Sequence, residues 1–364
     1  MLKIGSLELP SPFVQAPMAG FSNDAWRRIL LKFGGVGLLA SEMMHARGSL
    51  EMERRRKTLH GRLFGLPSRE KNGGEKNSFE NPFRAAGIPL SVQIWDNQPE
   101  PLAEFAEKLV LEYDIQVIDM NFGCPAPDVV QKARCGSWLL QFPERIAELA
   151  EAVVQAVHRA SSALGLSAPI PVTAKMRLGL SSESMTYASV AQALESAGVS
   201  AVTVHGRTTR QMYSGKADWE KIAEIKSLLH VPVIGNGDIR SAFQANEALR
   251  KWGVDGVMIG RAALNEPWLF RDAFALYSGA DDSELLKRPA AEFQKRLLLE
   301  HFDVLLEQHE ETEAVMLMRK FAPCYGVGLP NARQFRVHVT RTRTAAEFRQ
   351  AIEEYFPRDN PEAS

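Results

Sequence analysis

Short apolar runs recur along most of the chain, and each has the length of a buried β-strand. Eight such runs predict strands at residues 12–17, 36–43, 89–95, 115–121, 170–176, 200–205, 231–236 and 254–260. Amphipathic stretches with helical spacing separate most of them, such as those at residues 99–113 and 143–160. The pattern therefore predicts eight βα units.

Eight apolar strands alternating with helices favour a (β/α)8 TIM barrel over a doubly wound sheet. No G-x-G-x-x-G motif follows the first predicted strand, which removes the main support for a Rossmann fold. After the eighth unit the chain shows amphipathic helices without strands. We therefore predict an α/β barrel domain at residues 1–280 and a smaller helical domain at residues 281–364. A polar, glycine-rich segment at residues 68–87 is expected to be a loop.

Composition narrows the class of protein. Of the 364 residues, 45% are hydrophobic and 24% are charged, as in a soluble globular protein. No segment reaches the roughly 18 apolar residues of a membrane span, and the N-terminus does not resemble a signal peptide, so we expect a cytoplasmic protein. The three scattered cysteines, Cys124, Cys135 and Cys324, do not suit a disulfide framework or a four-cysteine metal site.

Charge is spread unevenly despite a net charge of -1. Between Glu300 and Glu313 there are six acidic residues and no Lys or Arg, whereas Met316 to Arg349 holds seven basic residues and one acidic residue. The second segment is therefore a local basic surface with a net charge of +6.

Polar residues stand at the C-terminal ends of the predicted strands, where TIM barrels carry their active sites. These positions hold Pro17, Met18, Glu42, Gln93, Asn121 with Cys124 just beyond, Lys175, His205, Asn236, Gly237, Asp238, Gly260 and Arg261. Any one of them alone is more often a hydrogen-bonded structural residue. Together, a lysine, a histidine and two amides in one cavity are costly to bury unless a ligand satisfies them.

Glycines and an arginine follow the seventh and eighth strands, in VIGNGDI (233–239) and VMIGRAAL (257–264). Such turns commonly bind phosphate in TIM barrels, although two ordinary tight turns are the alternative. A phosphate there, with Lys175 and Gln93 on other strands, suits FMN: Lys175 near the N1 and C2-carbonyl edge of the flavin, and Gln93 at its polar edge. No metal is expected, because no His, Asp and Glu residues show ligand spacing.

Seven ordered motifs resemble those of the tRNA-dihydrouridine synthases, which are flavin barrels with a C-terminal helical domain that binds tRNA. The motifs are APMAGFSNDAWR (16–27), SEMMHARG (41–48), NFGCPAPDVV (121–130), AKMRLG (174–179), VHGRTTRQMYSGKADW (204–219), VIGNGDI (233–239) and MIGRAALNEPWLF (258–270). The resemblance covers residues 10 to 270 and continues weakly through MRKFAPCY (318–325).

This resemblance implies NADPH-dependent reduction of the C5=C6 bond of particular uridines in tRNA. The residues that it implies for FMN binding are Pro17, Met18, Ala19, Gln93, Lys175, His205, Asn236, Gly237, Asp238, Gly260 and Arg261. Cys124 would be the catalytic acid, giving a proton to C5 while hydride from the flavin reaches C6. Asn121 and Arg177 are candidates for contacts with the uracil edge or the nucleotide phosphate, and Glu42 for orienting a neighbour or pairing with an arginine.

The local basic surface between Met316 and Arg349 is a candidate RNA-binding surface, because an enzyme that acts on a base in folded RNA must neutralise phosphates. Candidate residues are Arg333, Arg336, Arg341 and Arg343, with ERRRK (53–57) as a second contact. The alternative is a solvated face that pairs with the acidic run before it. The expected partner is tRNA, without a membrane, a metal or an obligate protein partner.

Cys124 has the chemistry of a proton donor. A thiol with a pKa of about 8.5 is mostly protonated at pH 7. A nucleophilic cysteine would instead need its thiolate stabilised by a histidine or a helix N-terminus, and no histidine lies near it in sequence. A buried, inert cysteine is the remaining alternative.

The segment ARCGSWLL (133–140) departs from the family pattern. Cys135 and Trp138 replace expected small residues, so the shape of the Cys124 loop is an open question. A Cys124–Cys135 disulfide is disfavoured in a reducing cytosol. Two rival functions remain: a flavin barrel that acts on a free pyrimidine or its dihydro form, and a non-catalytic RNA-binding protein.

Overall fold

Eight strands form the parallel wall of a barrel. The computed structural model describes residues 1–56, 82–113, 115–281, 285 and 289–356. The wall strands are β3 (Phe13–Gln15), β4 (Leu39–Ala40), β6 (Leu90–Trp95), β7 (Val117–Phe122), β8 (Val172–Arg177), β11 (Ala201–His205), β12 (Val233–Asn236) and β13 (Gly256–Ile259). They pair in the order β3-β13-β12-β11-β8-β7-β6-β4. The predicted TIM barrel is confirmed, and every predicted strand overlaps one of these eight.

The barrel closes between its first two strands. Val14 forms a parallel bridge with Leu38, and the Gln15 backbone N–H donates to the Leu38 carbonyl at 2.9 Å. A short strand, β5 (Met44–His45), pairs with the C-terminal end of β6. Two small antiparallel hairpins were not predicted, β1 (Lys3–Ile4) with β2 (Leu7–Glu8) and β9 (Gly179–Ser181) with β10 (Ser184–Met185), because strands of two or three residues leave no apolar run.

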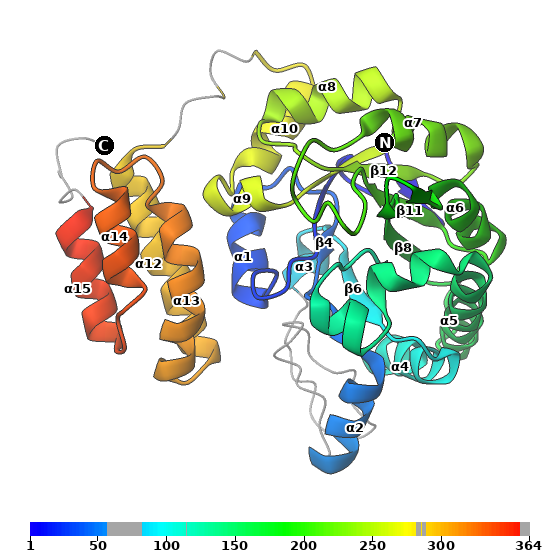
Figure 1. Cartoon of the computed structure of the whole chain (residues 1–364). Helices are drawn as coiled ribbons and strands as arrows, with labels where there is room; N and C mark the ends of the chain where they lie inside the picture. Colours follow the sequence, from blue (N-terminus) through cyan, green and yellow to red (C-terminus); the bar gives the residue numbers. More distant parts are fainter. Residues whose placement is uncertain (57–81, 114, 282–284, 286–288, 357–364) are drawn as a thin grey trace.

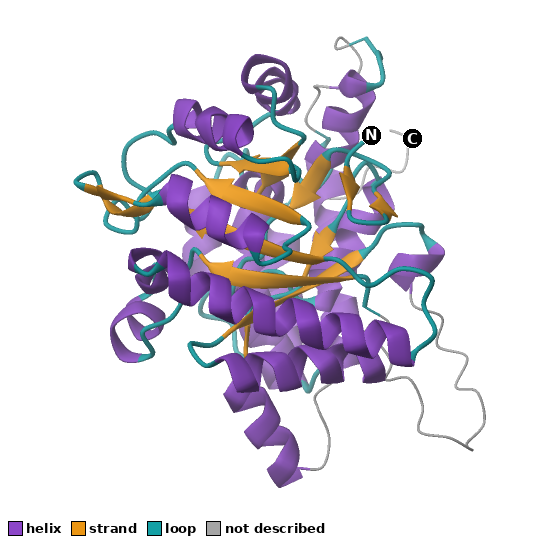
Figure 2. Ribbon diagram, turned by 90° about the vertical axis from the view of Figure 1, so that its right-hand side faces the viewer, coloured by secondary structure: helices purple, strands orange, loops and turns teal. Residues whose placement is uncertain are grey.

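Helices surround the strands and cover their outer face (Figures 1 and 2). Between the strands lie α1 (Asp24–Phe33), α2 (Ala46–Arg56), α3 (Pro82–Ala85), α4 (Pro99–Glu112), α5 (Pro143–Ala163), α6 (Tyr187–Ser196), α7 (Trp219–Leu228) and α8 (Ala242–Trp252). After β13 come α9 (Arg261–Asn265) and α10 (Leu269–Tyr277). Because both faces of each wall strand are covered, the strands are apolar almost throughout, which is the pattern that made them predictable.

Local signals fix the helix ends. The Ser241 side chain caps α8 by accepting from the Gln244 N–H at 3.2 Å, and Gly253 ends the helix with a left-handed φ of 64°. Asp218 caps α7 in the same way at the Lys221 N–H. Both caps lie at the ends of the loops that follow β11 and β12, so they fix where these loops end.

After residue 289, the described part of the chain forms four helices that stand beside the barrel, next to α1 and α9 (Figure 1). They are α12 (Ala291–Gln308), α13 (Glu311–Tyr325), α14 (Ala332–Val339) and α15 (Ala345–Tyr355). The C-terminal helices were predicted, whereas the domain boundary at residue 280 stays a prediction. The predicted loop at residues 68–87 lies mostly outside the described residues, and its last part includes α3. Among the helices of the described residues, none has the length and apolar character to cross a membrane.

An aromatic cluster joins α1 of the barrel to α12 and α13. The Trp26 ring stacks on Phe321 with centroids 5.7 Å apart, and the His301 ring meets Phe321 edge-on at 4.5 Å. His301 Nδ1 lies 3.0 Å from the Tyr325 hydroxyl. Burial lowers the pKa of His301 to about 3, so this ring is neutral at physiological pH. The contact is therefore a packed aromatic interface that encloses the His301–Tyr325 pair.

Candidate active site

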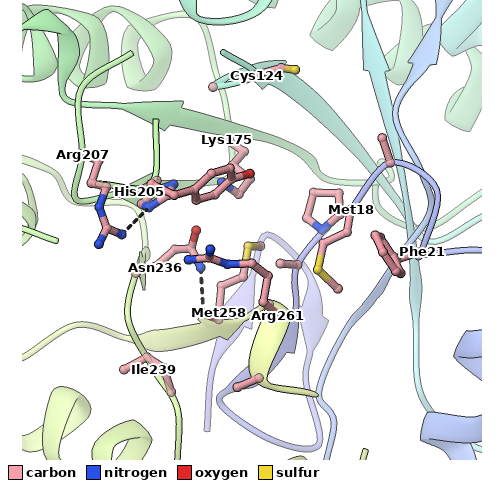
Figure 3. A pocket seen from close by; sticks show the side chains of 18 of the residues that line it. Met18, Phe21, Cys124, Lys175, His205, Arg207, Asn236, Ile239, Met258 and Arg261 are labelled. Carbon is pink, nitrogen blue, oxygen red and sulfur yellow. Dashed lines mark hydrogen bonds between the residues drawn. The ribbon is translucent and has the colours of Figure 1, made fainter. Parts of the chain in front are cut away.

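A cavity of about 730 Å³ lies at the C-terminal ends of the barrel strands, as expected for this fold. Figure 3 shows Met18, Cys124, Lys175, His205 and Arg261 around it. The structure brings every predicted catalytic, cofactor-binding and substrate-binding residue to its lining: Pro17, Met18, Ala19, Gln93, Asn121, Cys124, Lys175, Arg177, His205, Asn236, Gly237, Asp238, Gly260 and Arg261. Glu42 does not line it.

Lys175 projects from β8 into this cavity. Its ammonium group has no hydrogen-bond acceptor among the residues that the structure describes. Burial and the neighbouring Arg177 lower the pKa of Lys175 to about 8, against an opposing effect of Asp119 and Cys124. At neutral pH the ammonium is therefore still charged, and it is available to an acceptor group in the cavity.

His205, at the end of β11, is neutral and has a defined tautomer. Arg207 Nη1 lies 3.3 Å from His205 Nε2, and since a guanidinium only donates, Nε2 accepts and the ring proton is on Nδ1. Burial and the positive charges of Lys175, Arg177, Arg207 and Arg261 lower the pKa of His205 far below its usual value. His205 is thus a fixed donor at Nδ1 across the physiological pH range.

Arg207 is a buried site residue that sequence reasoning missed. Its Nη2 donates to both carboxylate oxygens of Asp238 at 2.8 Å, and the Ala217 N–H also donates to Asp238 at 2.7 Å. Burial raises the pKa of Asp238, but these hydrogen bonds outweigh it and bring the pKa below its usual value. The carboxylate is occupied within the protein, so the cofactor contact predicted for Asp238 remains a prediction. The only available signal was a basic residue two positions after a strand end.

Hydrogen bonds hold the loop that carries Cys124 on several sides. Asn121 Oδ1 accepts from the N–H groups of Gly123 and Cys124 at 3.0 and 2.9 Å. Arg177 Nε donates to the Gly123 carbonyl at 2.9 Å, and Ser137 Oγ donates to the Cys124 carbonyl at 3.0 Å. Asn121 and Arg177 thus position this loop, and their predicted substrate contacts remain predictions.

The protonation state of Cys124 suits a proton donor. Burial raises the pKa of this thiol, while a backbone hydrogen bond from Ala126 and the charges of Arg177 and Lys175 oppose that shift. The thiol is therefore protonated at neutral pH. The same two cations stabilise the thiolate that remains after the proton has left.

Cys135 and Trp138 point away from the site. Neither lines the cavity, and both Cys124 and Cys135 are free thiols. Cys135 is fully buried, and burial together with Asp96 raises its pKa to about 12. The Trp138 ring packs on Phe142 with centroids 5.0 Å apart. The unusual ARCGSW segment therefore leaves the space beside Cys124 open.

Gly136 is required where this segment passes the Cys124 loop. It has a φ of +57°, and a Cβ there would lie 2.7 Å from the Cys124 carbonyl oxygen. We expect Gly136→Ala to destabilise the protein by about 1–3 kcal/mol more than Gly165→Ala. Gly165 is the matched control, because its φ of +67° gives similar backbone strain but no atom lies within 4 Å of the added carbon. Urea unfolding of the two variants measures the difference, and equal losses would contradict the close contact.

Tyr213 also lines the cavity and was not predicted. Its ring lies under two guanidinium groups, with Arg261 Cζ at 4.3 Å and Arg177 Cζ at 5.6 Å from the centroid. Its side chain is 53% exposed, so the ring forms part of the cavity rim. An aromatic residue in the polar loop after β11 was the signal that could have identified it.

The predicted RNA-contact arginines occupy two kinds of surface. Arg333, Arg336, Arg341 and Arg343 are exposed, and none forms an ion pair within the described part of the chain. By contrast, Arg54 pairs with Glu104 at 2.9 Å and Arg55 pairs with Glu51. Within the described ranges, no group of three His, Cys, Asp or Glu side chains could hold a metal ion.

Comparisons with known proteins identify the family. Residues 14–360 match the family model described as dihydrouridine synthase. A probable tRNA-dihydrouridine synthase of Rickettsia conorii is 34% identical over 98% of this chain and 96% of that protein. The tRNA-dihydrouridine synthase B of Pseudomonas aeruginosa is 35% identical over the same shares. Histamine dehydrogenase from Rhizobium sp. 4-9 shares the barrel fold, with a TM-score of 0.52 and 12% identity over 83% of this chain and 50% of that one. The chain belongs to the dihydrouridine synthase family.

Proposed function

We propose that this protein reduces the C5=C6 bond of particular uridines in tRNA to give dihydrouridine, with FMN as its cofactor and NADPH as the reductant. The observation that carries the proposal is a protonated Cys124 thiol in the same cavity as a charged Lys175 ammonium, which has no hydrogen-bond acceptor among the described residues. The names of the relatives support tRNA as the substrate.

The donors that line the cavity fit a flavin nucleotide. The N–H groups of Gly237 and Asp238 have no acceptor among the described residues. At the start of α9 the Ala263 N–H donates to the Gly260 carbonyl at 3.0 Å, whereas those of Arg261 and Ala262 have no acceptor among the described residues. Gly237 has a φ of +135°, and a Cβ there would come within 2.5 Å of the Ala217 side chain. With the Arg261 side chain, these groups would hold the phosphate. Lys175, His205, Gln93 and the chain at residues 17–19 would hold the rest of the cofactor.

The residues around the cavity have distinct tasks in this reaction. When bound, reduced FMN supplies the hydride for C6 of the uracil. Lys175 places a positive charge beside the cofactor site and His205 presents a fixed Nδ1–H, so both favour negative charge there. Cys124 holds at Sγ the proton that C5 requires. Arg177 and Asn121 keep the Cys124 loop in place while this proton moves.

The exposed arginines of the C-terminal helices favour tRNA over a free pyrimidine. A small substrate needs no cationic surface outside the cavity, whereas folded RNA does. We propose that the helices after residue 280 form the tRNA-binding domain. The pairing of Arg54 and Arg55 with carboxylates makes α2 the weaker candidate for a second contact.

Replacing Arg333, Arg336, Arg341 and Arg343 together by glutamine is expected to weaken tRNA binding strongly. Each lost phosphate contact should lower the slope of log affinity against log salt by about 0.7–0.9. Titrations with labelled tRNA at several salt concentrations measure this slope. Arg349→Gln is the control, because Arg349 lies in the same helical region but forms an ion pair with Asp303. An unchanged slope in the quadruple variant would place the tRNA elsewhere.

Deletion of the gene tests the function in the cell. Mass spectrometry of tRNA from the deletion strain should show that dihydrouridine is missing at one or more positions, and that the intact gene restores it. The Cys124→Ala gene should not restore it. A deletion strain with its full dihydrouridine content, in an organism without a second synthase, would contradict the proposal.

A further inference from the structure

A series of hydrogen bonds between buried side chains, called here the hydrogen-bond chain, links the barrel interior to the Cys124 loop. Asp119 accepts two hydrogen bonds, from Thr173 Oγ1 at 2.7 Å and from Gln93 Nε2 at 2.6 Å. Gln93 Oε1 accepts from Asn121 Nδ2 at 2.8 Å. Gln93, Asp119 and Thr173 occupy paired positions on β6, β7 and β8, so their side chains point to the same face of the sheet. All four side chains are at most 8% exposed.

The hydrogen-bond chain ends at the backbone N–H groups beside the Cys124 thiol. Asn121 Oδ1 accepts from the N–H groups of Gly123 and Cys124 at 3.0 and 2.9 Å. These two groups can only donate, so the oxygen of Asn121 must face them and its nitrogen must face Gln93. The backbone therefore dictates the orientation of the first amide.

The carboxylate dictates the same orientation from the other end. Asp119 Oδ2 accepts from the Gln93 nitrogen, so the Gln93 oxygen faces Asn121. Burial raises the pKa of Asp119, and the hydrogen bonds from Thr173 and Gln93 and the charge of Lys175 oppose that shift. Reversing either amide would place two donors or two acceptors against each other in a buried site, which costs about 1–3 kcal/mol for each unsatisfied group. Both ends thus impose one direction on the whole chain of hydrogen bonds.

We propose that Asp119 is a positioning residue for Cys124, which it orients through Gln93 and Asn121. This inference rests on the proposed role of Cys124 as the proton donor. Asp119 does not itself line the cavity and has no hydrogen bond to the thiol. It fixes the direction of two amides, and the oxygen of the second, Asn121, accepts from the peptide N–H groups of the Cys124 loop. Through these hydrogen bonds, Asp119 in the barrel interior determines the position of the Cys124 thiol at the cavity.

The proposal predicts that the donor-to-acceptor direction of the hydrogen-bond chain can be reversed by two substitutions. Asn121→Asp still accepts from both backbone N–H groups, but it turns a second acceptor toward the Gln93 oxygen. Gln93 can relieve this conflict only by flipping, which then turns its oxygen toward the Asp119 carboxylate. If Asp119→Asn is added, the new amide nitrogen donates to the flipped Gln93, and its oxygen accepts from Thr173. The double variant satisfies every member in the reverse direction.

The test compares N121D, D119N and the double variant as flavin-loaded proteins. N121D should lower kcat by about 10- to 100-fold with a smaller change in KM, because it misplaces the donor. D119N should stay close to the parent protein, since its oxygen can accept from Gln93 while its nitrogen faces the Thr173 hydroxyl. The double variant should recover most of the loss.

A second readout does not depend on tRNA or on reductant. The rate of Cys124 alkylation by iodoacetamide as a function of pH, followed by mass spectrometry of its peptide, should change in N121D and return toward that of the parent in the double variant. Both carry Asp at position 121, so the effect of that added charge on the thiol is common to them. The D119N single variant measures the effect of the charge lost at position 119. This readout therefore tests the positioning role even if the proposed reaction is wrong.

If N121D fails to fold, recovery of folding by D119N is the same rescue and supports the proposal. A double variant that is no better than N121D in folding, alkylation and turnover would overturn it. So would a D119N single variant that is as impaired as N121D.

Discussion

Replacement of Cys124 by alanine is expected to lower uridine reduction by about 10²- to 10⁴-fold, the usual contribution of a positioned acid. The thiol is protonated, lines the cavity and lies near two cations, Arg177 and Lys175, that stabilise its conjugate base. Flavin content should be unchanged, because alanine removes only the sulfur from a loop that backbone contacts hold. Single-turnover reoxidation of the reduced flavin by tRNA measures the chemical step.

Cys324→Ala is the control for this variant. Cys324 is also a free, half-buried thiol, but it lies on α13 and does not line the cavity. Its replacement should leave the single-turnover rate within about twofold of the parent rate. A Cys124→Ala protein with full activity would assign the proton to another group and would remove Cys124 from the mechanism.

Replacement of Lys175 by methionine is expected to weaken FMN binding by about 10- to 100-fold, the loss for a charged hydrogen bond of about 1.5–3 kcal/mol. The substitution keeps an unbranched side chain of similar length but removes the ammonium, for which the described part of the chain offers no hydrogen-bond acceptor. Fluorescence titration of the flavin-free protein with FMN measures the affinity. Lys251→Met is the control, because Lys251 is exposed on α8 and packs over Trp252.

The pH dependence of FMN binding gives a sharper form of the same prediction. Burial lowers the pKa of Lys175 to about 8, so the cation is present below that pH and is lost as the pH rises through it. FMN affinity of the parent protein should therefore be flat below pH 8 and should fall above it. The Lys175→Met protein should lack this fall, and an identical fall in both proteins would contradict the assigned role.

The strands of the barrel wall could be predicted because the signal for each strand lies within its own residues. Each strand is covered on both faces, so the strand itself is an apolar run, and its polar last residue marks the site. The side chains at those ends, from Gln93 on β6 to Arg261 after β13, meet in one cavity as predicted.

The contacts inside the site could not be predicted, because they depend on register between strands. Gln93 and Asp119 are 26 residues apart, and Arg207 and Asp238 are 31 residues apart, yet each pair forms hydrogen bonds. Side-chain direction is equally hidden: Cys135 and Trp138 stand eleven and fourteen positions after Cys124, but both turn away from the cavity. Sequence spacing therefore identified the candidate site residues, but it did not show which of these residues hold other residues in position.

Flavin reoxidation by unmodified tRNA tests the central claim most directly. The protein is purified with FMN, reduced by NADPH without oxygen, and mixed with tRNA transcripts that contain no dihydrouridine. We predict that the flavin absorbance returns and that one dihydrouridine forms in tRNA for each flavin oxidised, while free uracil and uridine cause no comparable reoxidation. A protein that binds no flavin, or whose reduced flavin is reoxidised by free pyrimidine and not by tRNA, would contradict the account.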